Sequence, residues 1–173
     1  MRPTRVADWL QRRGFALRPW DSEREARIAI LEAVSIPRPG EPEDPGDPGS
    51  ALLTLVHSYA HRFIRPAAVP AGTDRNALSE LLVPLHLGFY VYAASSGDFV
   101  LGGLQAVFES DLHGLLAAVV HDEHRCPLDP GCLHSGGACM ACLHLGEPWC
   151  RYYNRFLDRS TLHGPGGYLM PDA

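Results

Sequence analysis

Five cysteines lie within the stretch 126–150, and the rest of the chain has none. The stretch Cys139-Met-Ala-Cys142 has the CxxC spacing, which sets two thiolates on one side of a tight turn where they can share a metal ion at a Zn–S distance of about 2.3 Å. Thiolates select zinc or iron–sulfur clusters over cations that prefer oxygen. The sequence therefore predicts a Zn2+ site made by four of the five cysteines, which are Cys126, Cys132, Cys139, Cys142 and Cys150.

The choice of the four ligands is open from spacing alone. Cys139, Cys142 and Cys150 are the firmest choices, and Cys126 and Cys132 compete for the fourth position. The alternatives are an imidazole from His134 or His144 in place of one thiolate, an iron–sulfur cluster, a redox-active CxxC, or disulfides. The spacings match no ferredoxin pattern well, and no thioredoxin-like βαβ unit surrounds the CxxC. A site closed by four thiolates leaves no open position for catalysis, so we expect a structural ion.

His57 and His61 stand at positions i and i+4 and therefore lie on one face of an expected helix, a spacing that suits zinc. The zincin motif HExxH needs a glutamate after the first histidine, and serine stands there in this sequence. The favoured interpretation is a structural pair whose ring nitrogens form hydrogen bonds with neighbouring residues. A contact role is the next alternative, and a hydrolase that uses His57, His61 or a cysteine nucleophile is the weakest.

Composition restricts the class of function. The chain has 173 residues, 46% of them hydrophobic, and all 15 basic residues are arginine. Without lysine the chain has no P-loop and no Schiff-base lysine, so any ATP hydrolysis must come from another polypeptide. The net charge of −5 argues against nonspecific nucleic-acid binding by the chain as a whole. No apolar run is long enough to cross a membrane, and the first residues lack an apolar signal core, so we expect a cytoplasmic protein.

Apolar periodicity and turn residues predict an α+β, mostly helical fold, with helices around a short β-hairpin and a four-cysteine zinc loop near the C-terminus. We expect a strand over 89–93 with a return strand near 99–101. Four parts follow from the composition. They are an N-terminal helical appendage (1–35), an acidic Pro/Gly linker (36–50), a main domain (51–163) and a C-terminal tail (164–173). The helices predicted from spacing are a pair within 4–35, in which Ser22 and Glu25 form a capping-box pattern, and then 51–65, 74–86, 110–124 and 151–160. The last of these would carry an arginine stripe at Arg151, Arg155 and Arg159. The favoured interpretation is a solvated face with Arg–Asp pairing, and contact with a phosphate backbone is the alternative.

Several of these motifs occur together in one known family. In chain order they are His57-Ser58-Tyr59-Ala60-His61, Phe89–Ala93 followed by Leu101-Gly102-Gly103-Leu104, Cys126-x2-Asp129-Pro130-x-Cys132, Ala138-Cys139-x2-Cys142-Leu143, Glu147-x2-Cys150 and Asn154-x2-Leu157-Asp158-Arg159. Over about 51–163 this series resembles the MrfA-like zinc-binding domain. That domain usually lies at the C-terminus of superfamily 2 DNA helicases of repair, and it also occurs in a helicase-associated subunit of a bacterial anti-phage defence system.

The resemblance implies a four-cysteine zinc site in an accessory domain beside a helicase motor. It equates Cys139, Cys142 and Cys150 with the CxxC and following cysteine of the family, and Cys126 and Cys132 with its upstream pair. The sequence contains no motor, so we expect a non-catalytic module that acts with a separately encoded DNA helicase or other ATPase. DNA would be bound as part of that complex, in DNA repair or anti-phage defence. The alternative is a protein–protein adaptor with no nucleic-acid role, which the negative charge favours over direct DNA binding.

Overall fold

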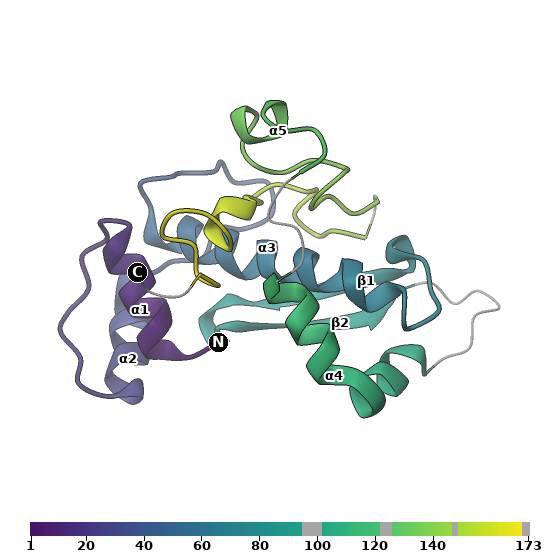
Figure 1. The fold of residues 1–173 in the computed structure, drawn as a ribbon. Helices are drawn as coiled ribbons and strands as arrows, with labels where there is room; N and C mark the ends of the chain where they lie inside the picture. The colour runs from purple at the N-terminus through teal and green to yellow at the C-terminus, as the bar shows by residue number, and fades with distance from the viewer. Residues whose placement is uncertain (95–101, 122–125, 147–148, 171–173) are drawn as a thin grey trace.

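The computed structural model describes residues 1–94, 102–121, 126–146 and 149–170. It confirms the expected fold class: helices surround a two-stranded antiparallel hairpin, and the cysteine loop stands on one side of the molecule (Figure 1). The elements, in order, are α1 Pro3–Arg12, α2 Glu23–Ala33, α3 Pro48–Ala68, η1 Arg75–Ala77, β1 Leu78–Val83, η2 Pro84–His86, β2 Gly88–Ala93, α4 Gly103–His121, α5 Gly131–His134 and η3 Arg159–Thr161.

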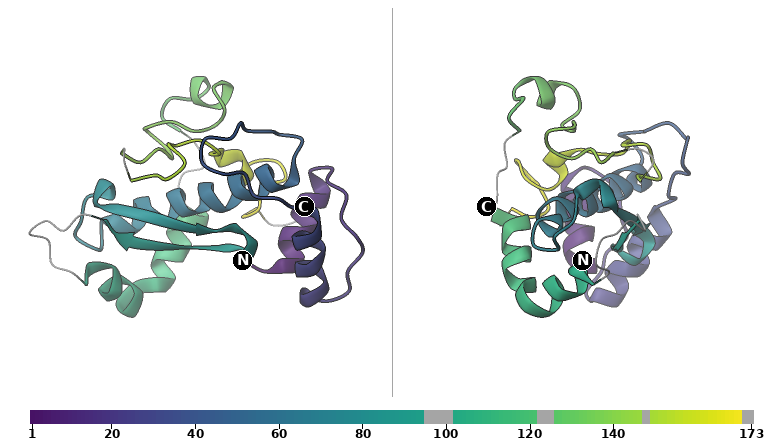
Figure 2. Two further views of the ribbon diagram at one scale, coloured as in Figure 1. Left: turned by 180° about the vertical axis from the view of Figure 1, so that it is seen from behind. Right: turned by 90° about the vertical axis from the view of Figure 1, so that its right-hand side faces the viewer.

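Helix α3 is the centre of the molecule. Thirteen of its 21 residues are buried, which is typical of a helix that is covered on most of its sides. The hairpin and α4 both lie against it, and the cysteine loop stands on the side away from the hairpin (Figure 2). Asp47 caps the start of the helix, since its carboxylate accepts a hydrogen bond from the Ser50 amide at 2.7 Å, and the helix continues past Pro66 to Ala68. The helix predicted over 51–65 is therefore present and extends further at both ends.

The N-terminal helices share a core with α3. Trp9 and Leu10 from α1, Ile30 from α2, and Leu52 and Val56 from α3 belong to one buried apolar cluster. The predicted N-cap at Ser22 is present, since its side chain accepts a hydrogen bond from the Glu25 amide at 3.2 Å. The appendage expected at 1–35 therefore packs directly on the first half of α3, and its boundaries as a separate unit stay a prediction.

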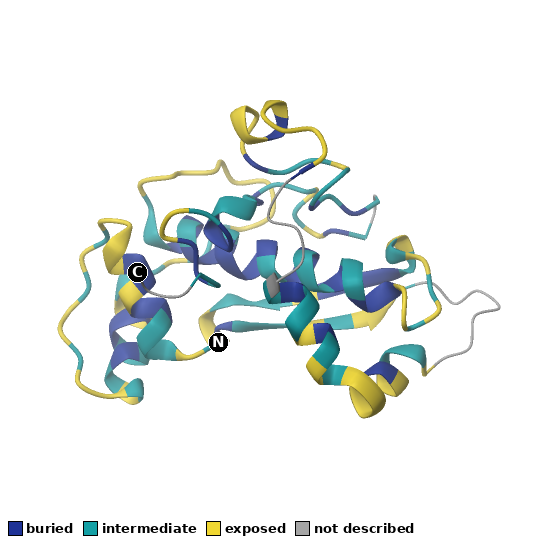
Figure 3. Ribbon diagram, in the orientation of Figure 1, coloured by how far each residue is buried: buried dark blue, intermediate teal, exposed yellow. Residues whose placement is uncertain are grey.

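The acidic linker at 36–50 is mostly exposed (Figure 3) and still contacts the C-terminal part of the chain. The Tyr152 hydroxyl donates to the Pro37 carbonyl at 3.0 Å, and the Phe156 amide donates to the Glu43 carboxylate at 3.0 Å. Glu43 also lies 3.5 Å from the Arg155 guanidinium. These contacts hold the linker along the segment that follows Cys150.

The prediction of a helix over 74–86 is wrong, because strand β1 occupies 78–83 there. It pairs with β2, with Leu78 opposite Ala93 and Val83 opposite Gly88. The leucines of this stretch have helical spacing, but Pro84 would disfavour the last turn of a helix here, and pairing with the aromatic strand β2 decides the conformation. β2 matches the strand predicted at 89–93; the predicted return strand at 99–101 lies outside the described residues.

Two further helix predictions differ from the structure. Helix α4 starts at Gly103 rather than 110, and its backbone is non-helical at Asp111, whose carboxylate accepts from the Gly114 amide at 3.0 Å as a helix cap would; residues 122–125 lie outside the described part. No α-helix forms over 151–160, where the structure has turns and then the start of η3, because three non-glycine residues, Tyr153, Asn154 and Phe156, have φ between 55° and 57°. That left-handed conformation ends any right-handed helix.

Candidate metal centre

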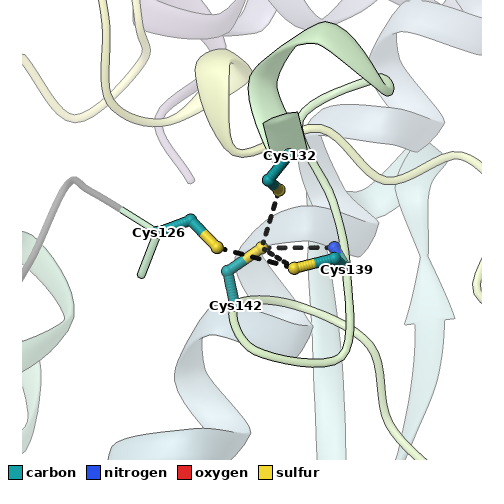
Figure 4. Close-up of side chains that lie close together, drawn as sticks. All are labelled: Cys126, Cys132, Cys139 and Cys142. Carbon is teal, nitrogen blue, oxygen red and sulfur yellow. Dashed lines mark hydrogen bonds between the residues drawn. The ribbon is translucent and has the colours of Figure 1, made fainter. Parts of the chain in front are cut away.

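Four cysteine sulfurs converge in the loop 126–142, as Figure 4 shows. The Sγ–Sγ distances are 3.5 Å for Cys126–Cys139, 3.6 Å for Cys132–Cys142 and 3.7 Å for Cys139–Cys142. A disulfide would need about 2.05 Å, and all five cysteines are free. Four thiolates at about 2.3 Å from one tetrahedral zinc ion lie about 3.8 Å apart, so these distances fit a zinc site made by four cysteines.

Backbone amides point at the sulfurs. The Cys139 amide donates to Cys142 Sγ at 3.2 Å, and the Leu128 amide donates to Cys126 Sγ at 3.4 Å. Hydrogen bonds of this kind favour the thiolate over the thiol, which is the form that binds metal. The turn closes with bonds from the amides of Cys142 and Leu143 to the Cys139 carbonyl, at 3.1 and 3.0 Å. The donor set and its surroundings therefore fit zinc.

The cysteine loop has little apolar packing of its own. Leu128, Leu133 and Met140 are 58%, 52% and 54% exposed, and among the described residues none from 126–142 belongs to an apolar core cluster. A loop of this composition cannot offset its conformational entropy by burial. A metal ion that is bound only by the folded loop would supply the missing stabilisation.

The end of the chain holds the loop in place through the motif Asn154-x2-Leu157-Asp158-Arg159. The Arg159 guanidinium pairs with the Asp129 carboxylate, which also accepts the Cys126 amide at 3.0 Å. The Arg159 amide donates to the Gly137 carbonyl at 3.1 Å. The Asp158 amide in turn donates to the Ser58 hydroxyl of α3 at 2.9 Å. This motif therefore connects the cysteine loop to the central helix.

Asn154 connects the loop to the segment that carries Cys150. Its side-chain amide makes two hydrogen bonds to the Leu145 backbone, both at 2.9 Å, and its own backbone amide donates to Cys150 Sγ at 3.2 Å. Leu145 packs with Ile64 of α3 and Leu78 of β1 in a second apolar cluster. The positive φ of Asn154 aims both the side chain and the backbone at these partners.

Cys150 lies apart from the other four cysteines, although its spacing placed it with Cys139 and Cys142. Its sulfur is 3.2 Å from the Nε2 atom of His57, and it forms a separate group with His57, His61 and Glu80. Between the two groups, Leu145 packs against Ile64 of α3 and Leu78 of β1, and Cys150 lies against His57 rather than in the cysteine loop. The alternative ligands, His134 and His144, belong to neither group of possible metal ligands among the described residues.

The second group is wholly buried. His57 and His61 have their rings 4.3 Å apart on successive turns of α3, and Glu80 points inward from β1. Burial lowers the pKa of His57 to about 4, so its imidazole is neutral at pH 7. Burial also raises the pKa of the Cys150 thiol to about 12. The sequence singled out both histidines but missed Glu80, because a strand that alternates Leu78, Glu80 and Leu82 on one face had been predicted as a helix.

The predicted arginine stripe is not formed, because the helix that would carry it is absent. Arg155 lies beside Glu43 of the linker, and Arg159 is paired with Asp129 of the cysteine loop. Both side chains therefore serve internal contacts in this structure.

No helix in the described part of the chain is long and apolar enough to cross a membrane. No family model and no solved structure matches the sequence. One curated protein is similar to it: over 173 aligned residues, 92% of this chain is covered at 27% identity. That relative is longer, and the chain spans 29% of its length. Its name is DISARM protein DrmB, from Bacillus paralicheniformis, so the chain shows weak homology to a DISARM protein and carries a four-cysteine cluster able to hold a metal ion.

Proposed function

We propose that the chain is a non-catalytic zinc-binding module of the MrfA-like kind that acts with a separately encoded DNA helicase or translocase in anti-phage defence. The observation that carries the proposal is the convergence of Cys126, Cys132, Cys139 and Cys142 in a chain that aligns over nearly its whole length with a protein named for DISARM. The pathway is proposed as defence rather than general DNA repair, because the relative is a DISARM protein.

Zinc in this proposal has a structural role. By fixing the loop 126–142 it would hold Asp129 and Gly137 against Arg159, and so keep the C-terminal segment in place over α3. The ion would thus order a surface rather than react. The partner supplies ATP hydrolysis, since the chain has no lysine and therefore no P-loop. The proposed location is the cytoplasm, where the helicase and its DNA would be found.

The hydrolase alternative finds no support in the geometry. His57 and His61 are both 0% exposed, and Glu80 is 4% exposed. A substrate has no path to these side chains as they stand, whereas a general base must come within hydrogen-bond distance of the proton that it removes. The adaptor alternative keeps its support from the net charge of −5, and the experiment below distinguishes it from helicase coupling.

The test is co-expression with a helicase encoded beside this chain, followed by affinity purification and measurement of DNA-dependent ATP hydrolysis and phage plaque counts. We expect co-purification, a higher rate of ATP hydrolysis with the module than without it, and fewer plaques. Cys142→Ser should remove all three effects, and Met140→Ser, an exposed position inside the same CxxC, should keep them. Co-purification that resists nuclease and high salt without any effect on ATP hydrolysis would support the adaptor and overturn helicase coupling.

A further inference from the structure

We propose that His57, His61, Glu80 and Cys150 bind a second zinc ion, separate from the four-cysteine site and structural in role. The four side chains come from α3, β1 and the segment after the cysteine loop, and their ligand atoms all lie within 4.8 Å of one another. This site goes beyond the proposed function, which involves only the ion in the loop 126–142.

The two distances from Glu80 to the histidines fit an ion between the side chains better than direct hydrogen bonds. Glu80 Oε1 lies 3.6 Å from His57 Nε2 and 3.5 Å from His61 Nε2, whereas a hydrogen bond between nitrogen and oxygen spans about 2.7–3.2 Å. Cys150 Sγ lies 3.2 Å from His57 Nε2. Ligands at about 2.0–2.3 Å from a tetrahedral zinc ion are separated by about 3.3–3.8 Å. Both Glu80 distances lie within that range, and the Cys150–His57 distance, which a direct hydrogen bond also allows, lies just below it.

The tautomer of His61 directs a lone pair at the centre of the group. Its Nδ1 lies 2.8 Å from the Leu143 carbonyl oxygen, which can only accept, so Nδ1 carries the hydrogen. In the neutral ring Nε2 is then unprotonated, and it faces the Glu80 carboxylate. A lone pair facing a carboxylate is repulsive unless a cation lies between them. A backbone carbonyl that holds the outer nitrogen is also the usual partner of metal-binding histidine.

Glu80 supplies the strongest argument. Its side chain is fully buried, and neither carboxylate oxygen has a hydrogen-bond partner among the described residues. A buried carboxylate that lacks a partner destabilises the folded state strongly. None of the nearby groups resolves this, since both imidazoles are too far away to donate well. A divalent ion coordinated by the carboxylate would resolve it directly.

The charges of the proposed site balance. When the ion binds, the Cys150 thiol releases its proton to solvent, and the resulting thiolate and the Glu80 carboxylate contribute two negative charges. Two neutral imidazoles add none, so the complex with Zn2+ is neutral, which suits a site whose four residues are all buried. The Asn154 amide, 3.2 Å from Cys150 Sγ, would stabilise the thiolate.

The donor set also selects the metal and its role. Two imidazoles, one thiolate and one carboxylate suit zinc, whereas calcium and magnesium prefer oxygen ligands alone. Four protein ligands close the tetrahedron, and a closed site holds a structural ion rather than a catalytic one. Since the ligands come from three elements, the ion would join α3, β1 and the segment around Cys150 into one unit.

The test begins with the wild-type chain purified under reducing conditions with zinc, then freed of loosely bound metal. Elemental analysis should find two zinc ions per chain. X-ray absorption at the zinc edge should find five sulfur ligands at about 2.3 Å and three nitrogen or oxygen ligands at about 2.0–2.1 Å, shared between the two ions. One zinc ion per chain with a shell of sulfur alone would overturn the proposal, whatever happens to any variant.

Variants then assign the second ion. Cys150→Ser and Glu80→Gln should each reduce the zinc content from two ions to one per chain, and the remaining ion should show sulfur ligands only. The matched control is Tyr152→Phe, whose ring packs beside His57 without ligating, and it should keep both ions. Retention of two ions by Cys150→Ser and Glu80→Gln would also overturn the site. If the helicase experiment fails while two ions are present, only the proposed function falls.

Discussion

The two clusters of possible metal ligands differ in how the chain assembles them. The four cysteines come from one stretch of 17 residues, 126–142, and two of them are partly exposed. His57, His61, Glu80 and Cys150 span 94 residues of sequence, 57–150, and all four are buried. The first cluster lies in a loop with little apolar packing, and the second lies at the contact between the central helix and the hairpin.

Metal binding would therefore serve a different purpose in each cluster. In the loop, convergence of sulfur substitutes for a hydrophobic core, so order in 126–146 should depend on the ion. In the interior, apolar packing of α3 against β1 and Leu145 already brings the polar groups together. An ion there would neutralise a carboxylate that the packing has buried. Removing the loop ion should therefore disorder only the loop. Weakening the apolar packing of α3 against β1 and Leu145 should weaken metal binding at both clusters.

The largest expected effect is that of removing the loop's CxxC. The double substitution Cys139→Ser and Cys142→Ser should abolish metal binding in the loop and remove most amide protection from 126–146, because few apolar contacts hold that segment. Protection in α3 should change little. Hydrogen exchange read by mass spectrometry measures both regions, with Met140→Ser as the control. Unchanged protection of 126–146 in the double variant would contradict a metal-dependent loop.

A smaller effect, spread over both clusters, is expected from Leu145→Ala. This side chain is 1% exposed and packs with Ile64 and Leu78, so its truncation should lower the free energy of unfolding by about 2–5 kcal/mol. Urea denaturation measures the change, and a chelator should then remove metal faster. Leu133→Ala, at a position 52% exposed, should change stability by no more than about 0.5 kcal/mol. Equal effects of the two variants would show that Leu145 does not join the loop to the core.

The smallest expected effect is a difference in stability between two variants at Asn154, which separates the contribution of its side-chain hydrogen bonds from that of its left-handed backbone. Asn154→Ala removes two hydrogen bonds to Leu145 and puts alanine at a φ of 57°; a loss of about 1–3 kcal/mol is expected from the hydrogen bonds. Asn154→Gly loses the same bonds but adopts this φ without strain, so it should be more stable than the alanine variant by about 1 kcal/mol. Urea denaturation of both compares them. An alanine variant as stable as the glycine variant would show that the left-handed backbone is not required.

Much of the helical framework could be predicted because its signals are local. The apolar face of α3, the Ser22 cap of α2 and the aromatic strand β2 depend on neighbours a few residues away. The errors arose where distant contacts decide. The stretch 78–83 has leucines at helical spacing and becomes a strand because β2 pairs with it. The segment 151–158 contains helix-forming residues and adopts turns, held by Asn154 and Asp158 on partners elsewhere in the chain.

By itself the sequence determined the α+β class, through local apolar periodicity, and the position of the cysteine loop with its candidate zinc chemistry, because clustered thiols can meet in one loop without distant contacts. Only the tertiary structure decided that Cys150 lies outside the four-cysteine cluster and beside His57, His61 and Glu80. Cys150 and Glu80 reach the histidines of α3 because the chain packs its apolar faces around that helix. Sequence spacing carries no information about two residues that meet only when separate elements are packed together.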